Sequence, residues 1–327
     1  MKNAKLTIWC NNDFSARDEA ERLRLIQGVG ENQLLLFDYD QNGSAGVARE
    51  ALQTADIAFG YPDSVAVSEC DNLKWVHLHS AGYTSFDKKD LRAKLSARGT
   101  VLTNSSAVYD EPCAQHLLAM IMSLARQLPA ALDSQRQDRS WRMVTLRDTS
   151  RLLNDQTVLI LGFGAIARRL VELLRPLQMN LIALRRTPTG DESIRVADIS
   201  RIDEFLPLTD HLVNILPDNE QTRNFLESSR LSKLKEGAIV YNIGRGSTLN
   251  QMVLLEKLNS GQITAAYLDV TSPEPLPPDN PLWTTPNCFI TPHSAGGHSN
   301  EKERQVDHFL NNLRRFEQGE PLLNRVL

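Results

Sequence analysis

The chain has 327 residues, of which 41% are hydrophobic and 23% are charged. This length suffices for two domains with cores of their own, and this composition excludes a disordered chain. A formal net charge of −4 gives no indication of nucleic-acid binding. No apolar run reaches the ~20 residues of a membrane helix, and the N-terminus is too polar for a secretory signal peptide, so we expect a cytoplasmic protein.

The cysteines indicate neither a metal site nor a disulfide framework. Cys10, Cys70, Cys113 and Cys288 lie far apart and in no metal-ligand spacing. We expect reduced cysteines that pack in the interior, and no bound metal.

Strands and helices alternate over the first hundred residues. This rhythm predicts a small parallel sheet with helices on both faces. The expected strands are residues 6–10, 34–37, 57–59, 75–78 and 101–103, and the expected helices are 16–28, 46–54 and 86–97.

Two loops of this region each follow a strand. They are Gly60-Tyr61-Pro62 and Ser80-Ala81-Gly82. Small residues at the carboxyl ends of parallel strands expose backbone N–H groups, which suit a small carboxylate. From these residues alone, plain turns are favoured over a site.

A long helix is expected at residues 109–128, because Asp110-Glu111-Pro112 are typical of a helix start and an apolar run follows. Residues 129–156 are polar, basic and weakly patterned, apart from Trp141. A stretch this long without a clear element is unusual in a compact domain. Two interpretations stay open: an arm that wraps over a partner subunit, or a surface arm on its own subunit.

A dinucleotide fingerprint is the strongest motif. The apolar strand 157–161 runs into Gly162-Phe163-Gly164-Ala165-Ile166-Ala167 and then into a helical pattern. Gly162 permits a sharp turn, Gly164 allows close approach of a pyrophosphate, and the helix start offers unpaired N–H groups. This order of strand, turn and helix predicts nucleotide binding.

The next strand, at 179–184, ends in Arg185 and Arg186, where an acidic residue would bind a ribose 2′-hydroxyl. Because a guanidinium holds a phosphate through paired donors, we infer NADP(H) in preference to NAD(H). The alternative is that both arginines only decorate a polar strand end.

Further elements follow the fingerprint to the end of the chain. Strands are expected at 212–216, 238–242, 265–269 and 290–291, and helices at 219–225 extending towards 227, at 251–259 and at 301–317.

Three late stretches carry a family resemblance. They are Asn242-Ile243-Gly244-Arg245-Gly246, Leu268-Asp269-Val270 with Glu274-Pro275-Leu276, and Thr291-Pro292-His293-Ser294-Ala295-Gly296. With Ser80-Ala81-Gly82, Glu111-Pro112-Cys113-Ala114-Gln115-His116, the fingerprint, and Leu216-Pro217 with Thr222, the chain resembles the D-isomer-specific 2-hydroxyacid dehydrogenase family over essentially its whole length. This family includes glyoxylate/hydroxypyruvate reductases and phosphoglycerate dehydrogenases.

The resemblance implies that Arg245, Glu274 and His293 are the catalytic residues. Reduction of a 2-keto acid needs a proton for the developing alkoxide, and a histidine can supply it at neutral pH. A carboxylate such as Glu274 would orient the ring, and Arg245 would bind the substrate carboxylate and polarise the keto group. By itself, His293 after a proline is more typical of a structural histidine.

The resemblance also assigns binding residues. The residues expected at the cofactor are Gly162, Phe163, Gly164, Ala165, Ile166, Arg185, Arg186, Leu216, Pro217, Thr222, Ile243 and Asp269. The residues expected at the substrate are Ser80, Ala81 and Gly82, together with Arg245 and His293. The identity of the substrate side chain would depend on residues 60–62, His79, Trp283 and, if the arm reaches a neighbouring active site, Trp141.

The implied fold is α/β, with two doubly wound parallel-sheet domains. A Rossmann nucleotide-binding domain, residues 107–290, would be inserted into a flavodoxin-like substrate domain formed by 1–106 and 291–327, with a closable cleft between them. Relatives are commonly homodimers. In such a dimer, residues 129–156 would be an arm exchanged between the subunits, and this arm carries Trp141.

Some residues depart from the family pattern. Asn250 stands where an aspartate is common, and Thr271-Ser272 replaces an aromatic-acidic continuation. The pair Arg185 and Arg186 is typical of the glyoxylate/hydroxypyruvate reductase type. The end of the sequence at Leu327 argues against the regulated phosphoglycerate dehydrogenases.

We therefore expect an NADPH-preferring reductase of small 2-keto acids to D-2-hydroxy acids, with glyoxylate or hydroxypyruvate as the first candidates. One alternative is an NAD-dependent dehydrogenase of a larger D-2-hydroxy acid, which a comparison of NADPH with NADH would separate. The other is a nucleotide-sensing binding protein on the same fold, which would bind nucleotide without turnover.

Overall fold

A computed structural model describes residues 5–37 and 46–327. The chain divides into two compact units. The first comprises Met1–Tyr109 and His298–Leu327, and the second comprises Asp110–Gly297.

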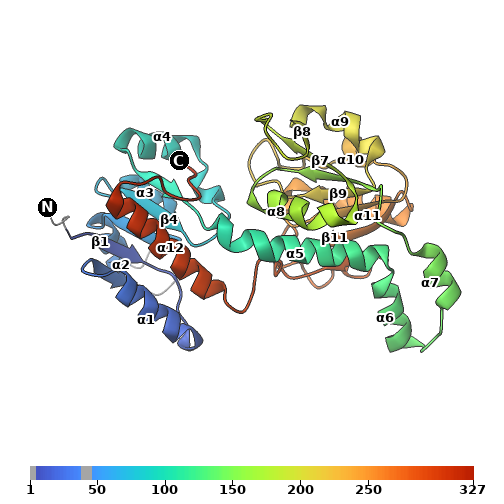
Figure 1. The fold of residues 1–327 in the computed structure, drawn as a ribbon, viewed down its shortest axis with the longest axis horizontal. Coiled ribbons are helices and arrows are strands. Elements are labelled where there is room, and N and C mark those ends of the chain that lie inside the picture. The colour runs from blue at the N-terminus through green and yellow to red at the C-terminus, as the bar shows by residue number, and fades with distance from the viewer. Residues whose placement is uncertain (1–4, 38–45) are drawn as a thin grey trace. The chain divides into compact units, whose positions relative to one another are not determined.

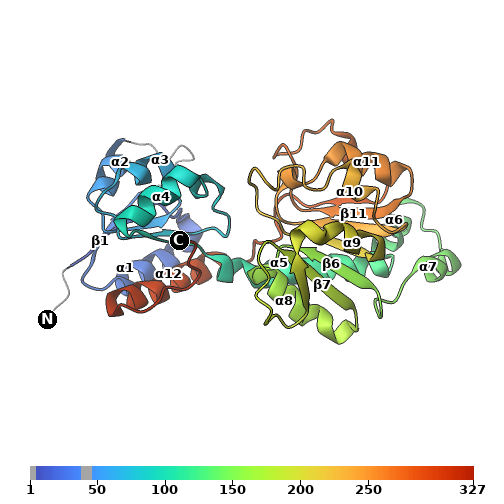
Figure 2. The same ribbon diagram turned by 90° about the horizontal axis from the view of Figure 1, so that it is seen from above.

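The first unit is built on a five-stranded parallel sheet. Its strands are β1 (Thr7–Cys10), β2 (Gln33–Leu36), β3 (Ile57–Gly60), β4 (Trp75–Leu78) and β5 (Val101–Thr103), in the order β2-β1-β3-β4-β5. Its helices are α1 (Glu19–Gly28), α2 (Gly46–Gln53), α3 (Ser64–Glu69), α4 (Lys89–Arg98) and α12 (Glu301–Gln318). Helices α1 and α12 lie side by side on one face of the sheet, and α2, α3 and α4 cover the other (Figures 1 and 2).

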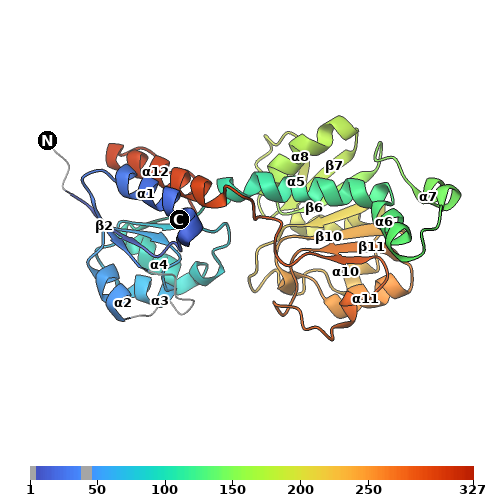
Figure 3. The ribbon, with the colours of Figure 1, turned by 90° about the horizontal axis from the view of Figure 1, so that it is seen from below.

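The second unit is built on a seven-stranded parallel sheet. Its strands are β6 (Thr157–Leu161), β7 (Asn180–Arg185), β8 (Arg195–Asp198), β9 (His211–Asn214), β10 (Ala238–Asn242), β11 (Ile263–Leu268) and β12 (Cys288–Ile290), in the order β12-β11-β10-β9-β6-β7-β8. Its other helices are α8 (Ala165–Leu174), α9 (Ile202–Phe205), α10 (Ser228–Leu231) and α11 (Gln251–Asn259). Helix α8 and the long helix α5 (Ser106–Ala125) cover one face, and α10 and α11 the other (Figures 2 and 3).

The apolar runs explain both sheets. Strands β4, β9 and β10 are buried at every position. Strands covered by helices on both faces must be apolar on both sides, so such runs read as parallel-sheet strands. The predicted fold class, two doubly wound parallel-sheet domains, is confirmed. The first sheet has the flavodoxin-like order and the second contains the dinucleotide-binding order.

Helix α5 begins three residues before the predicted start and ends earlier than predicted. The side chain of Asn104 accepts hydrogen bonds from the N–H and the hydroxyl of Ser106, at 3.2 and 2.8 Å, which starts the helix there. Gln127 takes a left-handed φ of 55°, which separates α5 from the next helix.

The prediction of no clear element within 129–156 is wrong. Helices α6 (Leu128–Gln137) and α7 (Met143–Thr149) occupy most of it, and α7 lies away from the sheet in every view (Figures 1 to 3). We call residues 128–150 the arm. Its helices were missed because they are short and their apolar positions are exposed, so they show no core-facing stripe.

The predicted helix at 219–225 is also wrong. Residues 219–224 form successive turns. Asn224 has a left-handed φ of 50°, and its N–H donates to the carbonyl oxygen of Ser247 at 2.8 Å. The backbone therefore pairs with a distant loop instead of continuing a helix, which no local pattern reveals.

Candidate active site

The predicted site residues of the second unit follow the carboxyl ends of neighbouring strands. Gly162 to Ile166 follow β6 and Arg186 follows β7, which ends at Arg185 itself. Leu216 and Pro217 follow β9, Ile243 and Arg245 follow β10, Asp269 and Glu274 follow β11, and His293 follows β12. Because these strands are parallel neighbours, the residues share one edge of the sheet. This is the edge where open α/β sheets bind ligands.

The turn between β6 and α8 fits a pyrophosphate. Gly162 has a φ of 94°, and a Cβ there would lie 3.2 Å from the carbonyl oxygen of Ile215. Gly164 is the N-cap of α8 without any side-chain cap, and a Cβ on it would meet no atom within 4 Å. The space beside Gly164 at the start of α8 is therefore open, as anion binding at the first N–H groups of a helix requires.

The end of β7 fits a second anion. The Nη1 atom of Arg185 is shielded from solvent and makes no hydrogen bond to any residue that the structure describes. Its nearest acidic partner is Glu192 Oε1, at 3.7 Å. Arg186 is exposed. Two guanidinium groups, one with an unused buried donor, suit a phosphate.

The loop after β9 is held by Thr222. Its hydroxyl donates to the carbonyl oxygen of Pro217 at 2.6 Å and accepts the N–H of Asn219 at 2.9 Å. Thr222 therefore fixes the turn that follows Leu216 and Pro217.

His293 and Glu274 form a pair. Glu274 Oε2 lies 2.8 Å from His293 Nδ1, and Glu274 Oε1 accepts the Thr271 N–H at 2.9 Å. The imidazole is 53% exposed and the carboxylate 37% exposed, so both remain open to a substrate. Since Nδ1 faces the carboxylate, Nε2 is the ring atom free to exchange a proton.

Asp269 holds the loop that carries His293. Its carboxylate accepts the Thr291 hydroxyl at 2.5 Å and the N–H groups of Ser294 and Ala295 at 2.9 and 3.1 Å. The Asp269 carbonyl oxygen accepts the N–H of His293 itself at 2.8 Å, while His293 adopts a left-handed φ of 51°. A left-handed non-glycine residue needs such surrounding support. Asp269 thus positions the histidine, a role that its sequence position does not reveal.

Arg245 lies in a tightly packed turn. Its Nη1 donates to the Gly244 carbonyl oxygen at 2.6 Å, and its own carbonyl oxygen accepts the Thr248 hydroxyl at 2.6 Å. A Cβ on Gly246 would lie 1.9 Å from the Thr271 carbonyl oxygen, so only glycine permits this contact. The turn of Arg245 therefore packs directly against the loop of Glu274.

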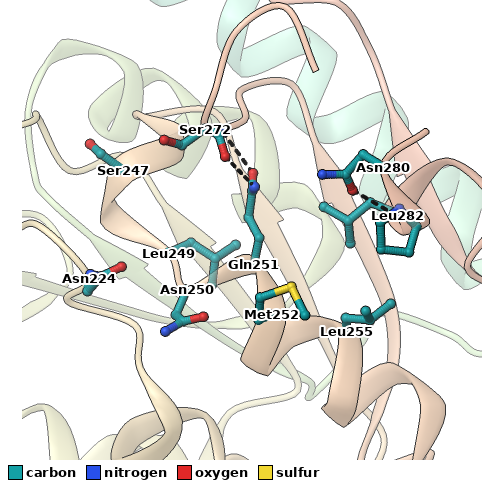
Figure 4. A pocket seen from close by; sticks show the side chains of 11 residues that line it. Asn224, Ser247, Leu249, Asn250, Gln251, Met252, Leu255, Ser272, Asn280 and Leu282 are labelled. Carbon is teal, nitrogen blue, oxygen red and sulfur yellow. Dashed lines mark hydrogen bonds between the residues drawn. The ribbon is translucent and has the colours of Figure 1, made fainter. Parts of the chain in front are cut away.

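A glutamine at the start of α11 joins this helix to the loop that precedes Glu274. Gln251, at the start of α11, donates from Nε2 to the Ser272 carbonyl oxygen at 2.7 Å and accepts the Ser272 N–H at 2.9 Å (Figure 4). Both residues line a cavity of about 290 Å³, together with Asn250. Asn250 caps α11 by accepting the Val253 N–H at 3.2 Å. Sequence reasoning missed Gln251, because only the tertiary structure pairs it with Ser272.

Ser80, Ala81 and Gly82 belong to the first unit and follow β4. Their carbonyl oxygens accept the Ser105 N–H at 3.0 Å, Asn104 Nδ2 at 2.8 Å and the Ser80 hydroxyl at 2.7 Å. Since the described hydrogen bonds of this loop involve its carbonyl oxygens, its N–H groups stay available for an anion. Burial lowers the pKa of the neighbouring His79 to about 4, so this histidine is neutral at physiological pH.

Two other histidines are structural. His211 bonds to the Tyr241 hydroxyl at 3.0 Å and to Gln156 Oε1 at 2.6 Å, and burial lowers its pKa to about 4. His77 is fully buried and lies 2.6 Å from the Thr103 hydroxyl. Within the described residues, no three His, Cys, Asp or Glu side chains are grouped as metal ligands.

Comparison with known proteins decides the family. Residues 118–295, more than half of the chain, match the family described as D-isomer specific 2-hydroxyacid dehydrogenase, NAD binding domain. The chain belongs to this family. The predicted family and the predicted enzyme class, a nicotinamide-nucleotide-dependent oxidoreductase, are confirmed.

Individual relatives agree with this 2-hydroxyacid dehydrogenase fold. The chain is 30% identical to human glyoxylate reductase/hydroxypyruvate reductase over 257 residues, covering 77% of this chain and 76% of the human one. It is 29% identical to glyoxylate reductase of Aeropyrum pernix over 284 residues, covering 85% and 84%. A D-isomer specific 2-hydroxyacid dehydrogenase from Xanthobacter autotrophicus Py2, solved with NADPH and MES, superimposes with a TM-score of 0.79 at 25% identity, covering 99% and 98%.

Among the described residues, no helix combines the length and the apolar character needed to cross a bilayer.

Proposed function

We propose that this chain reduces small 2-keto acids of the glyoxylate or hydroxypyruvate type to D-2-hydroxy acids, with NADPH as the preferred cofactor. The observation that carries the proposal is the pairing of His293 Nδ1 with Glu274 Oε2 at 2.8 Å, at the carboxyl edge of a dinucleotide-binding sheet. The relatives reported above include a glyoxylate reductase and a glyoxylate reductase/hydroxypyruvate reductase, which favours small substrates.

The residues of this chain divide the work between binding and proton transfer. The first turn of α8 would hold the pyrophosphate, and Arg185 and Arg186 the 2′-phosphate, while Leu216, Pro217, Ile243 and Asp269 border the nicotinamide. The bound cofactor supplies the hydride. Arg245 would bind the substrate carboxylate and polarise the keto group, which favours charge on the keto oxygen. His293 would donate its Nε2 proton to that oxygen, and Glu274 would orient the ring through its contact with Nδ1.

We propose residues 1–106 and 291–327 as the substrate domain and residues 107–290 as the nucleotide domain, with boundaries that fall before those of the two compact units, so that His293 counts here with the substrate domain. In the substrate domain, we propose the N–H groups of Ser80, Ala81 and Gly82 as binding groups for the substrate carboxylate. The backbone N–H groups carry no net charge, so the guanidinium of Arg245 would provide the main electrostatic attraction for the acid.

The test is oxidation of NADPH and of NADH, followed at the nicotinamide absorbance, with glyoxylate, hydroxypyruvate, pyruvate, phenylpyruvate and 2-ketoisocaproate. Turnover of glyoxylate or hydroxypyruvate with NADPH would support the proposal. Turnover of only the larger acids with NADH would favour the alternative, a dehydrogenase of larger D-2-hydroxy acids. Nucleotide binding without any turnover would favour a nucleotide sensor.

Cofactor preference is tested at the end of β7. Replacing Arg185 and Arg186 together by alanine is expected to weaken NADPH binding by about 10- to 100-fold, because two charge-assisted contacts to the 2′-phosphate are lost. NADH carries no such phosphate, so its dissociation constant should change less than about twofold. Titration of nucleotide fluorescence measures both constants. Arg201→Ala, at an exposed arginine paired with Glu204, is the control. An equal loss for NADPH and NADH would contradict the assignment.

We propose that the arm mediates a homodimer. Trp141 is 91% exposed, and Val144, Met143, Leu132 and Leu128 are exposed on the same arm. Exposed apolar residues gathered on one segment mark an association surface. Sedimentation analysis should show a dimer for the native chain and a monomer for Trp141→Ser/Val144→Ser. Leu208→Ser, at an exposed leucine outside the arm, should stay dimeric. A monomeric native chain would leave the arm as a surface feature of its own subunit.

A further inference from the structure

The loop between β7 and β8 folds back on a carboxylate. Glu192 Oε1 accepts the N–H of Thr189 at 2.7 Å and its hydroxyl at 2.8 Å, and Glu192 Oε2 accepts the N–H of Gly190 at 2.8 Å. The Glu192 side chain is only 4% exposed. A carboxylate in this position occupies a concavity of backbone donors, the arrangement that also binds phosphate oxygens.

This carboxylate lies beside the proposed 2′-phosphate site. Glu192 Oε1 is 3.7 Å from Arg185 Nη1, the shielded donor that makes no hydrogen bond to a described residue. At this distance the contact is electrostatic, and it leaves the Nη1 donor of Arg185 without a hydrogen bond to a described residue. An internal anion and a bound phosphate at this place would share the same positive charge.

The charge of Glu192 is permanent. The backbone N–H of Thr189, followed by the Thr189 hydroxyl and the N–H of Gly190, lowers its pKa to about 2 against the effect of burial. Glu192 is therefore ionised throughout the pH range in which the enzyme would work. The other acid of the loop, Asp191, is exposed and accepts the Thr189 hydroxyl at 2.5 Å.

We propose that Glu192 is a specificity-determining residue that limits the preference for the 2′-phosphorylated cofactor, because its carboxylate is held against Arg185 where the 2′-phosphate would bind. The proposal rests on the assignment of that phosphate to Arg185 and Arg186. Its physical basis is the repulsion between two anions that compete for one guanidinium in a partly shielded site. The effect must act on NADPH and not on NADH, since only NADPH carries the second anion.

The test measures binding, so that it does not depend on turnover. Calorimetric titration gives the dissociation constants of NADPH, NADH, adenosine 2′-monophosphate and adenosine 5′-monophosphate for the native chain and for Glu192→Gln. We expect Glu192→Gln to bind NADPH and the 2′-monophosphate about three- to tenfold more tightly, with NADH and the 5′-monophosphate within about twofold. The gain should shrink between about 0.02 M and about 0.5 M salt, because screening weakens the repulsion.

Two variants separate charge from geometry. Glu192→Asp keeps the charge but shortens the side chain, and it should show no gain for NADPH. Asp191→Asn removes an exposed charge of the same loop and should change NADPH binding less than about twofold. A gain in Glu192→Asp equal to that in Glu192→Gln would overturn the proposal, because charge would not be the cause.

Two other outcomes separate the role of Glu192 from the assignment of the 2′-phosphate to Arg185 and Arg186. Unchanged or weaker NADPH binding by Glu192→Gln, in a protein whose arginine variants lose NADPH selectively, would overturn the role of Glu192 alone. The 2′-phosphate assignment would be overturned if the native chain bound adenosine 2′- and 5′-monophosphate equally and if replacing Arg185 and Arg186 had no effect. The proposed role of Glu192 would then fall with it.

Discussion

Replacement of His293 by alanine is expected to lower turnover by about 10²-fold or more while leaving nucleotide affinity nearly unchanged. The expected loss is that of an acid–base group. The imidazole ring is held through Nδ1 by Glu274 Oε2 at 2.8 Å, while the backbone N–H of His293 donates to the Asp269 carbonyl oxygen at 2.8 Å and would still do so in the alanine variant. Without the ring, water would have to protonate the alkoxide.

The measurement is steady-state reduction of the best keto acid, combined with titration of nucleotide fluorescence. His298→Ala is a suitable control, because His298 lies five residues further on and bonds to Asn300 at 2.9 Å instead of to Glu274. Glu274→Gln keeps a hydrogen-bond acceptor beside Nδ1 but removes the charge, so we expect an intermediate loss. Native turnover by His293→Ala would remove this histidine from the mechanism.

Replacement of Arg245 by alanine should lower kcat/KM for the keto acid by about 10²- to 10³-fold, the scale on which removal of a transition-state donor acts. The KM for the keto acid should rise and kcat should fall, because the guanidinium is proposed to bind the carboxylate and to polarise the keto group. Arg245→Lys should recover only part of the loss, since an ammonium group does not provide the planar fork of donors.

Arg223→Ala is the matched control, because Arg223 is an exposed arginine of the same unit whose partner, Asp218, is 3.7 Å away. Thermal unfolding of each variant shows whether the packed turn has survived, since the Arg245 backbone bonds to Thr248 and Asn242 independently of the side chain. An Arg245→Ala protein with native kcat/KM would contradict the proposed role.

Local patterns were enough for the nucleotide-binding turn. Strand β6, the glycines 162 and 164 and helix α8 follow one another without a gap, so each requirement is met by neighbours in the sequence. The strand–turn–helix pattern predicts the conformation because the left-handed φ of Gly162 and the free helix start are properties of the backbone itself.

Local sequence patterns did not predict the long-range contacts. The helices of the arm lack a core-facing stripe, and residues 219–224 turn because Asn224 bonds to Ser247. The functions of Asp269 and Gln251 depend on partners that lie far away in the sequence and that only folding brings near. For Asp269 these are Ser294 and Ala295, 25 and 26 residues away.

The family, the doubly wound sheets and the candidate catalytic residues could be predicted from local signals, namely apolar runs and ordered motifs. The tertiary structure alone decided that Asp269 holds the His293 loop, that Gln251 binds the Ser272 peptide, and that Glu192 lies against Arg185. The physical reason is that hydrogen bonds and charge interactions act over a few ångströms in space. The order of residues along the chain does not state which distant groups will meet at that range.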